Sequence, residues 1–383
     1  MNLNPTNYQS PSSSQGVAGD MIAEIVQLRN KLTSSNAPVE LKEETMRSVD
    51  RLERIAKLGS YSSEFEKIDK YVDWITRIPW ATVTQDNLNI QNAKQIMDTT
   101  HYGMNTVKNL ILDYLSVMQL KTRRVHRDTE LPINQREVTR VVAPVLLFVG
   151  LQGVGKTSIT ESIANSMGRK FVRISLGAIG DVRTLRGVPR HELDSEPGQI
   201  IKALVRTGTM NPVILIDEIE KAATNVGLLN DVMAALLEIL DPEQNHAFID
   251  HYIDYPVDLS RVFFVCTANN LGGLSAALLD RLEVIRFTSY SDEEKKVIAQ
   301  SYLLPRVLAN TGLTKEYVQI MEEVWPLIIR PVGFDAGLRQ LERNIATMIR
   351  SAAREIVEGK TPPIIISPEN LREYVLADQG PLS

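Results

Sequence analysis

Cysteine is almost absent from this chain of 383 residues. The single cysteine, Cys266, lies inside the apolar run 262–266. A disulfide framework is therefore impossible, and we expect a core thiol rather than a nucleophile. A chain without structural disulfides is typical of a reducing environment, so we expect a cytoplasmic protein or one from another reducing intracellular compartment.

Long apolar runs are missing as well. No run approaches the roughly 20 residues that cross a bilayer, so we expect no membrane association. Residues 1–19 are rich in Ser, Asn, Gln and Pro, with neither a basic segment nor an apolar core. This composition excludes a signal peptide and predicts a disordered leader.

The chain also has no surplus of basic residues, with 42 Lys and Arg against 47 Asp and Glu. The formal net charge is -5, whereas a protein that binds phosphate backbones needs a basic face. We therefore expect no nucleic-acid partner. One basic cluster is expected to be a solvated neck after a helix; it consists of Lys121, Arg123, Arg124, His126 and Arg127.

The hydrophobic pattern divides the chain into a helical start, a central block and a helical end. The start predicts two amphipathic helices between Met21 and Leu58, joined at 34–38, because apolar residues recur there at helical spacing. Further helices are predicted at 63–74, 90–97, 105–120, 292–310, 315–325 and 336–357, with an extended piece at 363–366 before a last helix from Ser367.

The central block alternates apolar strands with helices. Helices are predicted at 155–167, 197–207 and 228–240, and strands at 145–149, 171–175, 213–217, 262–267 and 283–288. This alternation is typical of a parallel sheet with helical crossovers, which gives an α/β fold. The expected division is a leader at 1–19, a helical region at 20–84, a helical segment and connector at 85–140, the α/β domain at 141–288, a helical lid at 289–378 and a tail at 379–383.

A glycine-rich loop follows the first strand of this block and opens a helix. Its pattern, Gly-x-x-x-x-Gly-Lys-Thr, turns backbone N–H groups toward phosphates, with Lys156 on the β and γ phosphates of ATP and Thr157 on Mg²⁺. The cofactor-binding residues expected in this loop are Gly150, Gly153, Val154, Gly155, Lys156, Thr157 and Ser158.

Two acids end the buried strand at 213–217. Parallel strands deliver their carboxyl ends to one edge of a sheet, so these acids are expected beside the phosphate loop. Asp217 is predicted to hold the Mg²⁺ shell and Glu218 to act as general base toward the attacking water.

Three further polar residues are candidates for catalysis. Asn269 follows the next strand, where an amide orients the water or contacts the γ phosphate, or else only caps the turn. Arg281 is either a solvated surface residue or the transition-state cation for a neighbouring subunit. Arg339, at the start of a C-terminal helix, is placed to close on the same nucleotide.

Several longer stretches make the chain resemble the AAA+ ATPase module of Lon proteases. They are 100–104 (THYGM), 168–177 (GRKFVRISLG), 217–221 (DEIEK), 236–245 (LLEILDPEQN), 250–252 (DHY) and 278–284 (LLDRLEV). The resemblance implies an AAA+ fold, with Asn269 as sensor 1, Arg281 as arginine finger, Arg339 as sensor 2, and His101, Tyr102 and Gly103 beside the adenine. It also implies a hexameric ring.

The departures from this family concern the peptidase and the polypeptide-gripping loop. The similarity stops about where the Ser-Lys peptidase of the family begins, and no N-terminal substrate domain can be placed, so we expect no peptidase activity from this chain. Glu192-Leu193 stands where the family has an aromatic-aliphatic pair, a change expected to line the pore with negative charge. The second pore region, 222–231, is altered too, and Leu151-Gln152 replaces two prolines of the phosphate loop.

The sequence therefore predicts a Lon-like ATPase that unfolds or remodels proteins. A second hypothesis is the ATPase component of Lon-type proteolysis, with the peptidase missing or supplied by a separate chain. A third is an ATP-gated binding or assembly module with weak turnover. The expected partners are a polypeptide substrate or partner protein and further copies of the chain.

Overall fold

The computed structural model describes residues 14–57, 64–128, 143–176, 183–224, 229–330 and 337–375. Residues 1–13 of the predicted leader, residues 225–228 of the second pore region and the tail 379–383 lie outside these ranges. Within the ranges, the side chains of 122–128, which include most of the basic cluster, and of 222–224 and 229–230 are not described. The chain forms two compact units that interleave along the sequence: 1–83 with 181–210 and 243–259, and 84–180 with 211–242 and 260–383. The predicted division into consecutive domains stays a prediction.

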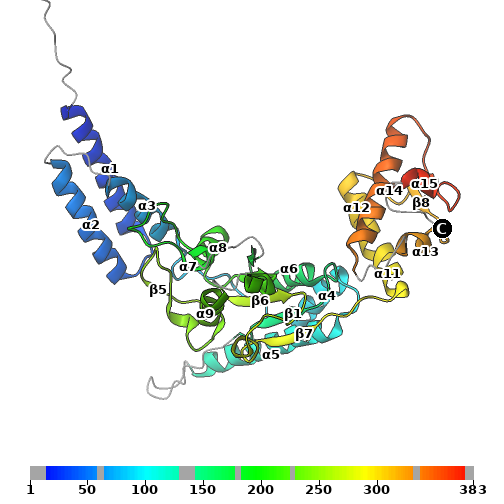
Figure 1. The fold of residues 1–383 in the computed structure, drawn as a ribbon, viewed down its shortest axis with the longest axis horizontal. Coiled ribbons are helices and arrows are strands. Elements are labelled where there is room, and N and C mark those ends of the chain that lie inside the picture. The colour runs from blue at the N-terminus through cyan, green and yellow to red at the C-terminus, as the bar shows by residue number, and fades with distance from the viewer. Residues whose placement is uncertain are drawn as a thin grey trace, which may run out of the picture. The chain divides into compact units, whose positions relative to one another are not determined.

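The first unit begins with three helices that pack on one another, α1 (Ser14–Ser34), α2 (Val39–Lys57) and α3 (Glu64–Arg77) (Figure 1). Their apolar stripes are buried, as predicted, and Arg29 of α1 pairs with Asp50 at 2.7 Å and Glu53 at 2.6 Å on α2. The prediction of a disordered leader to residue 19 was wrong for residues 14–19, which are helical. The last proline before α1 is Pro11, and α1 itself contains no proline, so its backbone N–H groups are all able to form helical hydrogen bonds.

The rest of this unit holds the short helix α7 (Arg183–Arg186), the helix α8 (Gln199–Thr207) and a hairpin of β4 (Phe248–Ile249) and β5 (Pro256–Val257), preceded by the 3-10 turn η4 (Asn245–Ala247). The buried Asp250 accepts N–H bonds from Gly198 at 2.7 Å, Tyr252 at 2.9 Å and Ile253 at 3.0 Å. Burial raises the pKa of this carboxyl to about 6. Asp250 thus ties the start of α8 to the hairpin.

The second unit is built on a parallel sheet in the order β2-β3-β6-β1-β7. These strands are β1 (Leu146–Val149), β2 (Phe171–Ser175), β3 (Val213–Asp217), β6 (Phe263–Ala268) and β7 (Glu283–Arg286). Every residue of β1, β3 and β6 is buried, because helices cover the sheet. The predicted α/β fold with a parallel sheet is confirmed.

One apolar core joins the sheet to α4 (Ile90–Thr100), α5 (Asn105–Asp128) and α6 (Lys156–Met167), which lie along it in Figure 1. Within it the rings of Tyr114 and Phe263 lie 5.2 Å apart. The 3-10 turn η3 (Ile219–Thr224), α9 (Leu229–Leu240) and the short α10 (Ala276–Leu279) complete this part of the unit. No helix of the described residues is long and apolar enough to cross a membrane.

The C-terminal segment has a core of its own. It contains α11 (Asp292–Ile298), the π turn η5 (Ala299–Leu303), α12 (Leu304–Thr311), β8 (Val318–Ile320), α13 (Val324–Ile329), α14 (Arg339–Val357), β9 (Ile364–Ile366) and α15 (Leu371–Tyr374). The prediction of a helix at 315–325 was wrong. Val318 to Ile320 pair in parallel with β9 instead, and this long-range pairing overrides the local helical pattern.

A buried ion pair between Arg169 and Asp86 links separate segments of the second unit. Arg169 donates to both carboxylate oxygens of Asp86 at 2.7 Å and to the carbonyl of Arg261 at 3.1 Å, and its side chain is 5% exposed. The pair joins the segment before α4 to the residues between α6 and β2 and to the start of β6.

We expect Asp86→Ala to lower the free energy of unfolding by about 3 kcal/mol, because it leaves the buried guanidinium without its carboxylate. Urea denaturation followed by circular dichroism measures the change. The double variant Asp86→Ala with Arg169→Met, which removes the unpaired charge as well, is expected to recover part of the loss. An Asp86→Ala protein as stable as the parent would contradict this account of the pair.

Candidate functional site

The glycine-rich loop leaves β1 at Gly150 and enters α6 at Lys156. Gly153 and Gly155 adopt φ of 82° and 94°, a region that side chains disfavour. A Cβ on Gly155 would also lie 2.9 Å from Cε of Met104. These glycines therefore let the backbone turn toward the start of α6, where N–H groups and the helix dipole favour an anion.

The Lys156 side chain folds back over this loop. Its ammonium donates to the carbonyls of Gly150 and of Leu151, the latter at 3.1 Å, and to Oδ1 of Asn269 at 3.3 Å. Burial lowers the pKa of Lys156. Phosphate oxygens are better partners for an ammonium than carbonyls, so the group is positioned to exchange these contacts for a phosphate.

The two acids at the end of β3 have well-defined partners. Asp217 accepts a hydrogen bond from the Thr267 hydroxyl and forms an ion pair with Arg173 of β2. Glu218 has a left-handed backbone, with φ of 60°, and its carboxylate pairs with Lys221 at 2.7 Å. The sheet thus delivers both acids to the edge where the phosphate loop lies.

Asn269 follows β6 and is held by Glu220. The Asn269 amide nitrogen donates to Oε1 of Glu220 at 2.6 Å, and its backbone N–H donates to the same oxygen at 3.2 Å. Its Oδ1 is thereby turned toward Lys156. This arrangement does more than cap a turn, because it links the amide to the lysine of the phosphate loop.

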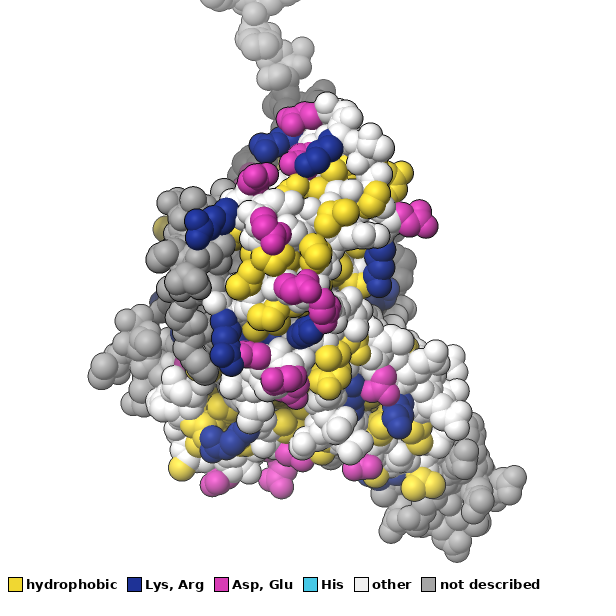
Figure 2. Space-filling view, turned by 90° about the vertical axis from the view of Figure 1, so that its right-hand side faces the viewer, with side chains coloured by type: hydrophobic (Ala, Val, Ile, Leu, Met, Phe, Trp, Pro, Cys, Tyr) yellow, Lys and Arg dark blue, Asp and Glu magenta, His cyan; other side chains and the backbone are white. Residues whose placement is uncertain are grey.

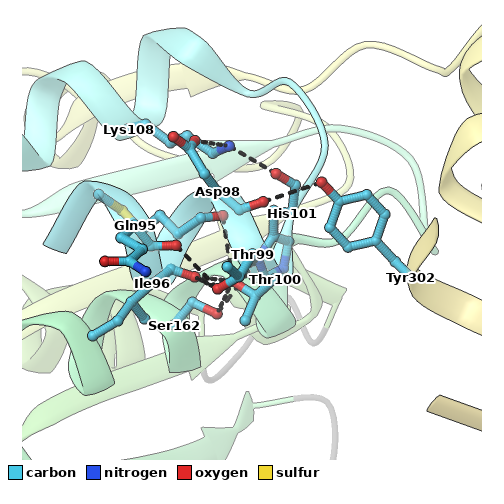
Figure 3. Close-up of polar contacts among 10 residues, drawn as sticks. Gln95, Ile96, Asp98, Thr99, Thr100, His101, Lys108, Ser162 and Tyr302 are labelled. Atoms are coloured by element: carbon cyan, nitrogen blue, oxygen red, sulfur yellow. Dashed lines mark hydrogen bonds and ion pairs between the residues drawn. The ribbon is translucent and has the colours of Figure 1, made fainter. Parts of the chain in front are cut away.

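The end of α4 and the segment after it contact α6, and Figure 3 shows Thr100 and His101 next to Ser162 of that helix. His101 contacts the Ser158 hydroxyl through Nε2 and the Thr100 hydroxyl through Nδ1, each at 2.9 Å. Burial lowers the pKa of His101 to about 4, so the ring is neutral near pH 7. Lys108 donates to the His101 carbonyl and to Asp98, each at 2.7 Å.

The C-terminal segment closes the site through backbone and hydroxyl contacts. Tyr302 reaches across to donate to the Asp98 carbonyl at 3.1 Å, as Figure 3 shows. Tyr290 donates to the Val154 carbonyl at 3.0 Å, and the Leu338 N–H donates to the Gly153 carbonyl at 2.9 Å. Arg339 lies beside Gln152, with Nη1 and Oε1 at 3.5 Å.

These elements enclose a cavity of about 720 Å³. Most of the site residues predicted from the sequence line it, namely His101, Tyr102, Gly153, Gly155, Lys156, Thr157, Ser158, Asp217, Glu218, Asn269 and Arg339. Gly103, Gly150 and Val154 are not among its lining residues, and they belong to the loops that shape it. The size and the mixture of donors suit a nucleotide.

Arg281 does not line the cavity. Its Nε donates to the buried Asp241 at 2.9 Å and its Nη1 donates to the Ala277 carbonyl at 2.9 Å, while the side chain is 38% exposed. Arg281 is thus fixed at the surface rather than placed on the nucleotide of its own chain.

Thr267, Arg173, Glu220, Lys221 and Tyr302 are contact residues that sequence reasoning did not single out. The strand register places Thr267 just beyond the Ile216–Cys266 pair, so only knowledge of which strands pair could have brought it next to Asp217. Lys221 lies three residues after Glu218, and that spacing was the one local signal available.

The loop of the first unit between α7 and α8 holds the Glu192-Leu193 pair. The Glu192 carboxylate pairs with Arg183 at 2.9 Å, so its negative charge is partly compensated. Leu193 is 92% exposed, an unusual degree for a large apolar side chain.

Comparisons with known proteins agree with this architecture. Residues 146–290 match the ATPase family associated with various cellular activities (AAA), and residues 309–364 match the Lon protease AAA+ ATPase lid domain. The chain is 44% identical over 352 residues to Lon protease 2 of Thermus thermophilus, covering 92% of this chain and 42% of that protein.

Other relatives give the same result. The Lon protease of Lawsonia intracellularis is 41% identical over 361 residues, or 94% of this chain and 41% of that protein. The Lon protease of Dictyoglomus thermophilum is 41% identical over 353 residues, which cover 92% of this chain and 42% of that protein. The chain spans about two fifths of the length of these relatives.

Together with the cavity between phosphate loop and lid, these matches show that the chain carries the nucleotide-binding AAA+ ATPase module of the Lon protease family.

Proposed function

We propose that this chain hydrolyses ATP and couples hydrolysis to the unfolding or remodelling of proteins. The observation that carries the proposal is the convergence of Lys156, both acids, Asn269 and Arg339 on one cavity. A module that only bound nucleotide would need neither a general base nor an amide fixed beside the phosphate lysine.

In this proposal each residue has a distinct task. Lys156 binds the β and γ phosphates, Glu218 accepts the proton of the attacking water, and Asn269 orients that water. Arg339 contacts the γ phosphate from the lid. His101, as a neutral ring, and Tyr102 border the adenine.

Mg²⁺ fits the residues at this site. Thr157 and Asp217 both line the cavity and offer a hydroxyl and a carboxylate oxygen, the hard donors that Mg²⁺ prefers while it keeps several waters. When bound, the ion would neutralise phosphate charge.

Arg281 is proposed to act on the nucleotide of an adjacent subunit. Its anchoring to Asp241 at the surface supports this, because a cation that stabilises the transition state in trans must be rigid and outward-facing. The assembly we propose is a closed ring, and six subunits is the number that the family resemblance suggests.

The substrate we propose is a polypeptide, in cytoplasm or another reducing compartment. The exposed Leu193 supports this, since an apolar side chain at a loop tip can contact an unfolded chain. On the face shown in Figure 2, acidic and basic side chains alternate rather than gather by sign, which does not favour nucleic acid. A second candidate, the ATPase step of ATP-dependent proteolysis, is favoured by the relatives named Lon protease.

Glu218→Gln is expected to lower ATP turnover at least about 100-fold while ATP still binds, because the amide cannot accept the water proton. Steady-state phosphate release and binding of a fluorescent ATP analogue measure the two effects. Glu293→Gln, the same change at an exposed position of α11, is the control. Turnover at the parent rate in Glu218→Gln would remove Glu218 from the role of base.

Arg281→Gln is expected to bind ATP but hydrolyse it at least about 100-fold more slowly. Mixed with Glu218→Gln at equal amounts, it should regain activity, since about a quarter of the interfaces in a random ring join an intact base to an intact arginine. Circular dichroism checks that the variant is folded, because the substitution removes the ion pair of Arg281 with Asp241. Two folded variants that stay inactive when mixed would count against action in trans.

Leu193→Ala is expected to reduce the stimulation of ATP turnover by an unfolded polypeptide such as casein to less than about a third. The loss follows from the smaller apolar surface offered to the polypeptide. Val357→Ala is the control, because Val357 is also 87% exposed but belongs to the lid. Equal stimulation in parent and Leu193→Ala would separate this loop from polypeptide binding.

A further inference from the structure

Thr267 lies at the end of β6 with a side chain that is almost completely buried, since the residue is 1% exposed. Its hydroxyl donates to Oδ1 of Asp217 and accepts the backbone N–H of Glu218 at 3.0 Å. One hydroxyl therefore contacts two successive residues, and both are the acids of the proposed nucleotide site. A hydroxyl has one hydrogen to give, so these two bonds define the rotamer of Thr267.

The contact to Asp217 determines how this carboxylate is turned. Thr267 holds Oδ1 from the side of β6, and Arg173 holds Oδ2 from the side of β2. The Asp217 side chain is only 8% exposed. With both oxygens engaged from opposite strands, the carboxylate has one orientation before any metal arrives.

The contact between the Thr267 hydroxyl and the Glu218 N–H helps to hold Glu218 in an unusual backbone conformation. Glu218 has φ of 60°, a left-handed conformation that a non-glycine residue adopts only when its surroundings hold it there. Its N–H would otherwise be left without an acceptor where β3 ends. The Thr267 hydroxyl supplies that acceptor and so helps to fix the direction in which Glu218 leaves the sheet.

The same strand end carries Asn269. The parallel ladder of β3 and β6 ends at the pair of Ile216 with Cys266, so Thr267 is the first residue past this ladder and Asn269 follows two residues later. Glu220, which holds Asn269, lies two residues beyond Glu218. Thr267 thus belongs to a cross-link between the strand of the acids and the strand of the amide.

We propose that Thr267 is a positioning residue for hydrolysis, which orients Asp217 toward the metal and Glu218 toward the water. The inference rests on the proposed ATPase function. Thr267 itself is not expected to touch the water or the γ phosphate in this role. It differs from an ordinary buried threonine because one partner is the carboxylate proposed to hold the metal, and the other is the backbone N–H of the residue proposed to act as base.

The test compares Thr267→Val, which keeps the shape but removes the hydroxyl, with Thr267→Ser, which keeps the hydroxyl. Thr45→Val is the matched control. Thr45 is a threonine of α2 that is 2% exposed, and its hydroxyl donates to the Leu41 carbonyl at 2.7 Å. The measurements are kcat and KM for ATP, the Mg²⁺ concentration that gives half-maximal binding of a fluorescent ATP analogue, and Tm.

For Thr267→Val we expect kcat to fall about 10- to 100-fold, in the range seen when a group that orients catalytic residues is lost. The half-maximal Mg²⁺ concentration should rise several-fold, while binding of the analogue without Mg²⁺ stays within about 2-fold, since Lys156 and the loop are intact. Thr267→Ser should restore kcat to within about 3-fold. Thr45→Val should change Tm alone.

A folded Thr267→Val that keeps its kcat and its Mg²⁺ requirement would overturn the proposal. Thr267→Ser behaving like Thr267→Val would do so as well, because the methyl group rather than the hydroxyl would then matter. If Thr267→Val does not fold, Thr267→Ala carries the same expectation without added bulk. If the parent protein itself fails to hydrolyse ATP, the proposed function fails, whereas the Mg²⁺ requirement still decides the role of Thr267.

Discussion

The parallel pairing of β1, β3 and β6 is the constraint on which the site depends. Their registers bring three strand ends to one edge, where Val149 leads into the phosphate loop, Asp217 ends β3, and Asn269 follows β6. Residues that are far apart in the sequence meet because all three strands are buried and run in the same direction. A change of register by one residue would turn every one of these side chains to the other face.

Polar groups placed at this edge must be compensated, because burying a carboxylate without a partner is costly. Asp217 pairs with Arg173 and accepts from the Thr267 hydroxyl, and Glu218 pairs with Lys221. Glu220 accepts from the neutral Asn269 amide through Oε1, while its buried Oε2 has no hydrogen-bond partner among the described residues. The Lys156 ammonium donates to the backbone carbonyls of Gly150 and Leu151. A nucleotide with its metal would therefore meet two acids, Asp217 and Glu218, that are already paired with cations, so binding at these acids is an exchange of partners. The free energy of that exchange is much smaller than the Coulomb attraction of bare charges would suggest.

The sequence predicted those features of the fold that depend on residues close together in the chain. The phosphate loop, the five strands of the parallel sheet and the long helices follow from glycines, apolar runs and periodicity, and the structure has them close to the expected positions. The strand β8 and the hairpin β4–β5 were missed, because their pairing partners lie far along the chain or in very short segments. Arg173 and Thr267 were missed for the same reason, since an ordinary arginine and threonine acquire importance only once the strand order is known.

Among the described residues, hydrogen bonds join the lid to the α/β part around the cavity. They bear on how the lid responds to a nucleotide. Tyr302 donates to the carbonyl of Asp98 at the end of α4, and Leu338 donates to the carbonyl of Gly153 in the phosphate loop. The lid keeps a core of its own, so we expect any movement of the lid to leave that core intact. Isolated hydrogen bonds exchange readily with water, each at a small net cost. In the proposed function, a nucleotide that bridges the two sides would therefore control the position of the lid, and loss of its γ phosphate would release Arg339.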